Sequence, residues 1–371
     1  MRICHIIDNM FLDRGGPVAV VAGLAGAQAE RGDDVSVLCR SRLRHGELLS
    51  EGHVLDPRII VVETESSGSA SRKSVSAALD ALAPDMLHVH GVWEKFHRQA
   101  TSWARTHRIP WVLSTHGMMH PVPMSQGWIK KRAYLLLLGG AVRGARRLLV
   151  TSEEERTFVS RMTGRPSVFV PNGVPILSDD CSDPSMFRRS VPTLGDAPYL
   201  LFLGRIHEIK GLDKLVRAYA AALGEGMDAD LVLAGPEDGF GAEVRRVAEA
   251  SGVMTRVHFA GAVYGARKVS ALAGCVAFVH RPNYEGFGMT VVEAMAAGRP
   301  AITTGVCGVA RACPPDVMII APDTDEGFGE AMANGLVHRA DLEAMARRGA
   351  EWVRTALSWH TIAAQVMQAY A

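Results

Sequence analysis

Hydrophobic residues in the first half of the chain recur in short runs, which longer amphipathic stretches separate. Short apolar runs of this kind are typical of strands buried on both faces of a parallel sheet, and the stretches between them have a helical period. Strands are expected at residues 2–8, 34–40, 59–64, 86–90, 110–115, 147–151 and 167–171. The alternation predicts a parallel sheet wrapped by helices, which is a doubly wound α/β domain.

A second series of the same kind follows a polar, proline-containing stretch at residues 178–197. Its strands are expected at residues 198–204, 230–235, 256–261, 275–280, 300–304 and 317–321. A chain of 371 residues is long for one hydrophobic core and suits two. The expected organisation is a Rossmann-like domain over 1–175, a second one over 176–345, and a helical segment over 346–371.

Several classes of protein are disfavoured by what the sequence lacks. Neither half contains the Gly-x-Gly-x-x-Gly fingerprint of a dinucleotide-dependent oxidoreductase. The six cysteines are scattered without a Cys-x-x-Cys pair, so we expect reduced, mostly buried thiols. No apolar run is long enough to cross a membrane, and the sequence opens on a strand pattern instead of a signal peptide. A cytoplasmic protein is therefore expected.

Charge is distributed unevenly along the chain. Residues 1–175 hold 22 Lys and Arg against 16 Asp and Glu, whereas residues 176–371 hold 18 against 23. The densest basic cluster comprises Lys130, Lys131, Arg132, Arg143, Arg146 and Arg147. Because this cluster surrounds Trp128 and the run Leu135–Leu138, the segment could lie on an anionic inner-membrane surface. The alternative is a buried helix with solvated basic ends, which the four consecutive leucines favour. No recognition motif or aromatic platform indicates nucleic-acid binding.

The most informative chemistry lies between residues 283 and 300. Glu285 precedes a glycine loop, and Glu293 falls in the first turn of the helix that follows it. A helix N-terminus attracts phosphate, while carboxylates accept hydrogen bonds from hydroxyl groups. That combination suits a nucleotide-sugar. The alternative for Glu293 is a capping box with Thr290, which requires no ligand.

Two cations follow the apolar run at residues 199–203. Arg205 and Lys210 lie in the loop that leaves this expected strand, where they could neutralise a pyrophosphate. Either residue alone would be an ordinary surface charge. Together with the two glutamates they indicate a site for a nucleoside diphosphate.

With these motifs the chain resembles the retaining glycosyltransferases of glycosyltransferase family 4, over nearly its whole length. The matching segments are Gly15-Gly16-Pro17, His88-Val-His-Gly91, Ser114-Thr-His-Gly117, Thr151-Ser-Glu153, Val170-Pro-Asn-Gly173, Gly204-Arg205 with Lys210-Gly211, and Glu285 with Glu293. The last two are the most specific. The resemblance implies the GT-B fold, in which two Rossmann-like domains face a central cleft and a C-terminal helix crosses back onto the first domain.

The resemblance also implies roles for particular residues. The donor would be a UDP-sugar or GDP-sugar, with Glu293 on the ribose hydroxyls and Glu285 on a hydroxyl of the sugar. The expected catalytic residues are His116, Arg205, Lys210 and Glu285. The expected donor-site residues are Gly16, Arg205, Lys210, Val263, Glu285, Gly286, Phe287, Gly288, Met289, Thr290 and Glu293. No metal is expected, since the cations can stabilise the leaving group and the Asp-x-Asp pairs at 228/230 and 323/325 lie in loops beside strands.

The acceptor is expected on the N-terminal domain. Its contacts are predicted at Gly15, Pro17, His90, Trp93 and His120, near the Met- and Pro-rich loop 118–126. A saccharide, lipid-linked at the membrane face, is the first expectation, and a small natural product is the alternative. Strand alternation is expected to place one of His88 and His90 in the core. His120 competes with His116 for the sugar contact.

Three other functions remain open from the sequence. A GT-B epimerase or phosphorylase would share the donor site, and a nucleotide-sugar-binding protein would bind the donor without transferring it.

If the reaction retains configuration, a same-face displacement is expected, because no side chain is evidently placed as a nucleophile. The sequence does not distinguish a UDP-sugar from a GDP-sugar.

Overall fold

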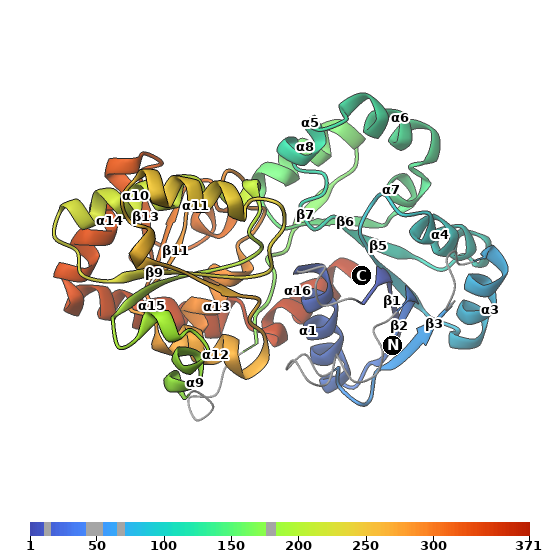
Figure 1. Cartoon of the computed structure of the whole chain (residues 1–371). Helices are drawn as coiled ribbons and strands as arrows, with labels where there is room; N and C mark the ends of the chain where they lie inside the picture. Colours follow the sequence, from blue (N-terminus) through green and yellow to red (C-terminus); the bar gives the residue numbers. More distant parts are fainter. Residues whose placement is uncertain (11–15, 42–54, 65–70, 176–182) are drawn as a thin grey trace. The chain divides into compact units, whose positions relative to one another are not determined.

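The computed structural model describes residues 1–10, 16–41, 55–64, 71–175 and 183–371. The chain divides into two compact units, one formed by Met1–Gly173 with Leu357–Ala371 and the other by Val174–Ala356 (Figure 1). The boundary expected after residue 345 falls inside helix α15 (Arg339–Ala356), which belongs wholly to the second unit. The chain returns to the first unit only at Leu357.

The first unit is built on a seven-stranded sheet with the order β3-β2-β1-β4-β5-β6-β7. Every neighbouring pair in this sheet is parallel. The strands are β1 (Arg2–Asn9), β2 (Asp34–Ser41), β3 (Ile60–Glu63), β4 (Met86–His90), β5 (Trp111–Ser114), β6 (Arg147–Val150) and β7 (Ser167–Phe169). The strand order reverses between β1 and β4, and ligands of such sheets bind outside the carboxyl ends of the strands at that point.

Helices cover both faces of this sheet. They are α1 (Gly16–Glu30), α3 (Arg72–Leu82), α4 (Lys95–His107), α5 (Pro121–Ser125), α6 (Trp128–Leu138), α7 (Gly140–Gly144), α8 (Glu153–Thr163) and α16 (Trp359–Tyr370). Alternate residues of β1 serve the two faces: Ile6 belongs to the cluster that includes α3 and α4, and Ile7 to the cluster that includes α1. The doubly wound fold predicted for this half is confirmed.

Helix α16 completes the first unit by packing against α1. Trp359 lies against Gly23 and Gly173, where an added Cβ would come within 2.1 Å and 2.4 Å of the indole ring. Only glycine leaves room for the ring at these two positions, so the small residues of α1 serve this packing. The C-terminal helix therefore belongs structurally to the N-terminal domain, as the resemblance implied.

The second unit repeats the plan with a six-stranded parallel sheet in the order β10-β9-β8-β11-β12-β13. Its strands are β8 (Tyr199–Leu203), β9 (Asp230–Ala234), β10 (Val257–Gly261), β11 (Ala277–His280), β12 (Ala301–Thr304) and β13 (Ile319–Ala321). Its helices are α9 (Pro184–Arg189), α10 (Leu212–Gly224), α11 (Gly241–Ala250), α12 (Gly265–Gly274), α13 (Met289–Ala296), α14 (Asp325–Val337) and α15. The order reverses between β8 and β11, so the loops after these strands meet at the ligand-binding edge.

Helix α6 differs from the buried helix that its leucine run favoured. None of its residues is buried, and Ile129, Leu136 and Leu137 are 82%, 70% and 78% exposed. Lys131, Tyr134 and Leu135 are partly buried: Lys131 donates to Pro123 O, Tyr134 to Val92 O, and Leu135 packs against the core of the unit. The buried-helix interpretation was therefore wrong.

Two further expectations concern the whole chain. No helix among the described residues has the length and hydropathy needed to cross a membrane. The described cysteines are all free thiols, and burial raises the pKa of Cys4, Cys275 and Cys307 to about 12. Cys181 lies outside the described residues.

Candidate active site

The glycine loop before α13 is held by the segment that follows β12. Val309 N donates to Phe287 O at 2.7 Å and Gly308 N to Glu285 O at 3.1 Å. The two backbones approach so closely that a Cβ on Gly308 would lie 2.1 Å from Gly286 O. The loop is thereby fixed against a second strand end, which a site for a rigid ligand group requires.

Helix α13 begins at Met289, with Gly288 as its N-cap at φ 102°. Thr290 is the second helical residue and does not cap the helix, so the capping-box interpretation of Glu293 was wrong. With no side chain capping this end, the first N–H groups of α13 point out of the helix and can bind an anion.

Glu285 lies at the centre of a partly buried charge cluster. Its Oε2 accepts from Lys210 Nζ at 2.6 Å and contacts His280 Nε2 at 3.1 Å. Burial alone would raise the pKa of Glu285, but Lys210 and His280 together bring it well below its usual range. Burial lowers the pKa of His280 although Glu285 opposes this. An ionised carboxylate beside a neutral imidazole results, and both contacts use Oε2, so Oε1 can accept from a ligand hydroxyl.

Glu293 presents an unsatisfied acceptor. Its Oε1 accepts from Lys268 Nζ at 2.6 Å, whereas its Oε2 is buried without a hydrogen-bond partner among the described residues. An orphaned buried carboxylate oxygen is costly and calls for an explanation. A ligand hydroxyl donating to Oε2 would supply one.

The two predicted cations are both engaged in ion pairs. Arg205 donates to Asp238 Oδ2 at 2.5 Å, and about half of each side chain is exposed. Lys210 is paired with Glu285 and is only 20% exposed. Val263, predicted to line the same site, is buried in the loop after β10. The second unit thus brings together Lys210, Glu285 and the start of α13, as the motifs predicted.

His116 follows β5 in the first unit, in a left-handed backbone conformation with φ 51°. Such a conformation is uncommon for a residue with a side chain and often marks a functional site. Its loop is held by buried Glu155, whose Oε1 accepts from Thr115 Oγ1 at 2.8 Å and from Met119 N at 3.2 Å. The strained position of His116 is therefore fixed by the surrounding structure.

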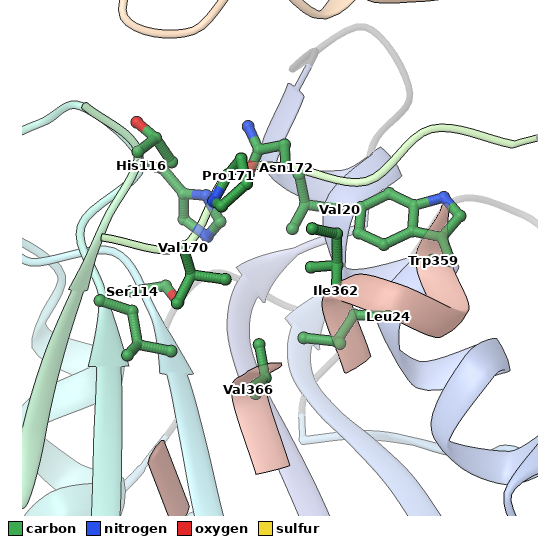
Figure 2. A pocket seen from close by; sticks show the side chains of 12 residues that line it. Val20, Leu24, Ser114, His116, Val170, Pro171, Asn172, Trp359, Ile362 and Val366 are labelled. Carbon is green, nitrogen blue, oxygen red and sulfur yellow. The ribbon is translucent and has the colours of Figure 1, made fainter. Parts of the chain in front are cut away.

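A pocket of the first unit has His116 on one side and Trp359 on the other (Figure 2). Its remaining lining residues are Val20, Leu24, Ser114, Leu149, Thr151, Val170, Pro171, Asn172, Ile362 and Val366. The lining is mostly apolar, and the space holds little more than a water molecule. This pocket lies beside the predicted sugar contact and is too small to be a substrate site.

The predicted acceptor residues have varied surroundings. His120 is buried, its Nδ1 accepts from Val122 N at 3.3 Å to cap α5, and its Nε2 lies 3.2 Å from Glu154. Trp93 is partly buried and packs edge-on against Tyr134. Gly16 and Pro17 open helix α1, whereas Gly15 lies outside the described residues.

The expectation for the histidines of β4 was wrong. His88 and His90 are both buried, at 1% and 3% exposure, because residues two apart on a strand share one face of the sheet. His5 of β1 pairs in register with His88 and adds a third imidazole to the same face. Both ring nitrogens of His90 are hydrogen-bonded to other histidines.

The residues that resemble metal ligands are already satisfied by the protein. Asp230 contacts Arg256 and His258 at 2.8 Å and 2.7 Å, and Asp323 contacts Lys214 and Arg281. The nitrogens of His5, His88 and His90 cluster within 4.8 Å, but the rings of His88 and His90 are stacked. Stacked rings do not aim their lone pairs at one point, and each nitrogen has a hydrogen bond. Neither the two aspartates nor the three histidines are arranged to bind a metal cation.

Sequence reasoning did not assign roles to three partners of the predicted residues. His280 and Lys268 hold the two glutamates, and Asp238 holds Arg205. His280 is the last residue of β11 and so lies at the binding edge, which is a usable signal. Lys268 and Asp238 are distant in sequence from Glu293 and Arg205, and no sequence motif marks either of them.

Two doubly wound parallel sheets, each with a switch point in its strand order, are the architecture of the GT-B fold. The family described as "Glycosyl transferase 4-like domain" matches residues 15–173, and "Glycosyl transferases group 1" matches residues 186–352. The chain belongs to glycosyltransferase family 4 and is a glycosyltransferase.

Its relatives and structural neighbours agree with this assignment. The chain is 28% identical to a phosphatidyl-myo-inositol mannosyltransferase of Mycobacterium leprae, over 100% of this chain and 96% of the relative. It is 24% identical to a GDP-mannose:cellobiosyl-diphosphopolyprenol alpha-mannosyltransferase of Xanthomonas oryzae, over 93% and 86%. The fold resembles that of Anabaena HepE in complex with UDP and glucose, with a TM-score of 0.77 and 18% identity over 100% and 99% of the chains. Sucrose-phosphate synthase from Thermosynechococcus elongatus gives a TM-score of 0.75 at 20% identity over 100% and 98%.

Proposed function

We propose that the protein is a retaining hexosyltransferase that moves a sugar from a nucleoside-diphosphate-sugar to a hydroxyl of a lipid-linked saccharide. The observation that carries the donor assignment is the buried, unpartnered Oε2 of Glu293 beside the uncapped start of α13. One end of the site accepts hydroxyl hydrogen bonds and the other binds phosphate. A nucleoside diphosphate joins these two chemistries in one ligand.

In the proposed reaction, the bond between the anomeric carbon and the diphosphate breaks as the acceptor hydroxyl attacks from the same face. Arg205, Lys210 and the first N–H groups of α13 stabilise the charge on the departing diphosphate, which takes up the proton of the attacking hydroxyl. Glu285 is tied to Lys210 and His280, so it orients a donor hydroxyl instead of forming a covalent intermediate. These charges supply the electrostatic stabilisation without a required metal.

The donor assignment is tested by thermal denaturation with UDP, GDP, ADP and their common sugar conjugates. A ligand that binds the folded state raises the melting temperature, and one nucleotide series is expected to do so clearly. A Gly308→Ala variant should lose this shift, because its methyl group displaces the glycine loop. Gly305→Ala is the matched control, since a Cβ there meets nothing within 4 Å. If no nucleotide shifts the unsubstituted protein, the donor site is misassigned.

Nucleotide binding alone does not distinguish a transferase from the other candidates. A binding protein would show the shift but release no nucleoside diphosphate in the presence of saccharide acceptors. An epimerase would convert the donor without an acceptor, and a phosphorylase would require phosphate. Product analysis with and without acceptor therefore separates these functions.

A lipid-linked acceptor is supported by the exposed face of α6. Ile129, Ala133, Leu136 and Leu137 follow the i, i+4, i+7, i+8 spacing of one helical stripe, and all four are exposed. Exposed basic residues lie beside the stripe at Lys130 and Arg132 on α6, and Arg143 of α7 donates back to Leu136 O at 3.0 Å. Exposed apolar side chains with cations beside them fit an anionic lipid surface. The names of the two mannosyltransferases above refer to lipid-linked acceptors.

We expect the double variant Ile129→Ser/Leu137→Ser to bind anionic phosphatidylglycerol vesicles at least about tenfold more weakly than the unsubstituted protein. Burying either side chain in lipid should contribute about 1.5–3 kcal/mol, and about 1.4 kcal/mol corresponds to tenfold in affinity. Vesicle co-sedimentation at two salt concentrations measures the effect. Val337→Ser is the control, because Val337 is 76% exposed on α14 of the second unit. Equal binding by all three proteins would contradict a lipid-docking role for α6.

A further inference from the structure

A continuous line of hydrogen bonds joins His116 to the last turn of α16. His116 Nε2 lies 3.0 Å from His90 Nδ1, and His90 Nε2 lies 2.9 Å from His5 Nδ1. His5 Nε2 lies 2.7 Å from Gln28 Oε1, and Gln28 Nε2 donates to Tyr370 Oη at 3.1 Å. The line crosses the loop after β5, the strands β4 and β1, and the helices α1 and α16. We refer to these five residues as the histidine line.

A branch extends from the same tyrosine. Tyr370 Oη lies 2.8 Å from His88 Nδ1, and His88 Nε2 lies 2.7 Å from Ser114 Oγ. The residues of the histidine line and of this branch, apart from His116, are at most 8% exposed. Within this interior the proton positions are therefore set by the partners themselves.

The imidazoles of the histidine line are neutral at neutral pH. Burial lowers the pKa of His5 and of His116 to about 4, and it also lowers the pKa of His90 well below its ordinary value. A neutral imidazole carries one N–H and one lone pair. Each ring in the line must then donate on one side and accept on the other, so a single group can determine the direction of them all.

Gln28 is that group. Its Oε1 can only accept, so His5 carries its proton on Nε2 and accepts at Nδ1. His90 then donates from Nε2 and accepts at Nδ1, and His116 donates from Nε2. The remaining nitrogen of His116, Nδ1, is left with a lone pair. On the other branch, Tyr370 accepts from Gln28 and gives its own proton to His88.

Turning the Gln28 amide over would reverse every one of these bonds. His5 would then accept from the amide N–H₂ group, and His116 would present an N–H at Nδ1 instead of a lone pair. The two directions differ in which amide atom faces Tyr370 and Met367. Met367 Sδ lies 3.9 Å from Gln28 Nε2 and can only accept, so it favours the direction in which Oε1 faces His5. The phenol is thus coupled to His116 through four hydrogen bonds.

We propose that Gln28 and Tyr370 are positioning residues that fix the tautomer of His116, so that His116 Nδ1 acts as a hydrogen-bond acceptor toward a hydroxyl of the bound ligand. The inference rests on the proposed function for the identity of that ligand. The tautomer itself is a property of the free protein. C-terminal helix α16 therefore contributes to the chemistry of the first unit as well as to its packing.

The test is ¹⁵N NMR of protein labelled in its histidine rings, recorded without ligand near pH 7.5. His116 is assigned by the resonances that disappear in a His116→Gln variant. The unsubstituted protein is expected to show a single His116 tautomer with the proton on Nε2. In Tyr370→Phe, which lacks only one oxygen, the Gln28 amide N–H₂ group loses its strong acceptor. Only the weak acceptor Met367 Sδ, at 3.9 Å, then orients the amide, and both His116 tautomers should be populated. A proton on Nδ1 in the unsubstituted protein, or an unchanged tautomer in Tyr370→Phe, would overturn the proposal.

Two controls separate a positioning role from a merely structural one. Tyr134→Phe removes a half-buried phenol of the same unit that lies outside the histidine line, and it should leave the His116 resonances unchanged. Gln28→Leu, if it folds, should mix the tautomers as Tyr370→Phe does; if it does not fold, Tyr370→Phe carries the test alone.

Kinetics provide the second readout. Tyr370→Phe should transfer sugar about tenfold more slowly, since a wrongly protonated histidine presents a donor where an acceptor is needed. A changed tautomer with unchanged turnover would refute the positioning role. If no nucleotide-sugar is turned over by any form of the protein, the proposed function fails, whereas the NMR result still decides the tautomer.

Discussion

An Arg205→Ala variant is expected to transfer sugar about a hundred to a thousand times more slowly than the unsubstituted enzyme. The magnitude is that of removing one preorganised group that stabilises charge in a transition state. Arg205 lies in the loop after β8, where its guanidinium can reach a departing diphosphate, and Asp238 holds it at 2.5 Å. Turnover is measured as nucleoside diphosphate released from the donor that thermal denaturation identifies.

The fold should not be affected by this change. The pair formed by Arg205 and Asp238 is about half exposed, and exposed ion pairs contribute at most about 1 kcal/mol to stability. Arg246→Ala is the matched control, because Arg246 forms an exposed pair with Glu243 on α11 of the same unit. A full rate in Arg205→Ala, or an equal loss in Arg246→Ala, would show that Arg205 has no part in the chemistry.

The strands and the glycine loop were predictable because each depends on local sequence. Buried parallel strands need continuous apolar runs, and every run predicted in both halves forms a strand. Arg205, Lys210 and Glu285 were predictable for the same reason, since all three follow strands whose carboxyl ends meet at one edge of the sheet. Long-range partners could not be predicted in this way. Lys268 meets Glu293 only because α12, which carries Lys268, lies next to α13 in the fold.

Two interpretations failed because a local pattern fits more than one geometry. Thr290 and Glu293 have capping-box spacing, yet the helix begins one residue before Thr290 and has a glycine cap. The run Leu135–Leu138 is apolar enough for a core, yet three of its four residues are exposed. Sequence period alone does not reveal whether an apolar helix lies over the core or beyond it.

The buried histidines predict a second large effect, on stability in acid. We expect the free energy of unfolding of the first unit to fall by several kcal/mol between pH 7 and pH 5. Burial lowers the pKa of His5, His97 and His116 to about 4 and holds the pKa values of His88 and His90 well below the ordinary histidine value. The unfolded chain takes up these protons near the ordinary histidine pKa of about 6.5.

The sign follows from which state binds more protons. Between pH 6.5 and pH 4 the unfolded histidines are protonated and the folded ones are not, so each lowers stability by up to about 1.4 kcal/mol per pH unit as the pH falls. Above the unfolded pKa both states are neutral and the contribution is constant. Burial also raises the pKa of Glu94 and of Glu155, which act in the opposite direction because their folded carboxyls protonate first. Two carboxyls offset only part of the effect of five imidazoles.

Urea denaturation at a series of pH values, followed by tryptophan fluorescence, measures this slope for the first unit. Five of the six tryptophans belong to that unit, so the signal reports mainly its unfolding.

The sharpest variant is His97→Leu, because His97 is 1% exposed and neither of its nitrogens has a partner among the described residues. This variant should take up about one proton fewer on unfolding, so its free energy of unfolding should fall less steeply as the pH is lowered. It should not destabilise the unit at pH 7.5, since no hydrogen bond is lost. His360→Gln is the comparison variant, because it removes an imidazole that is 69% exposed on α16, and it should change the slope less than His97→Leu does. A stability that stays level from pH 7 to pH 5 would mean that the buried imidazoles take up protons in the folded state. The tautomer argument for His116 would then lose its basis as well, because a doubly protonated ring has no lone pair to direct.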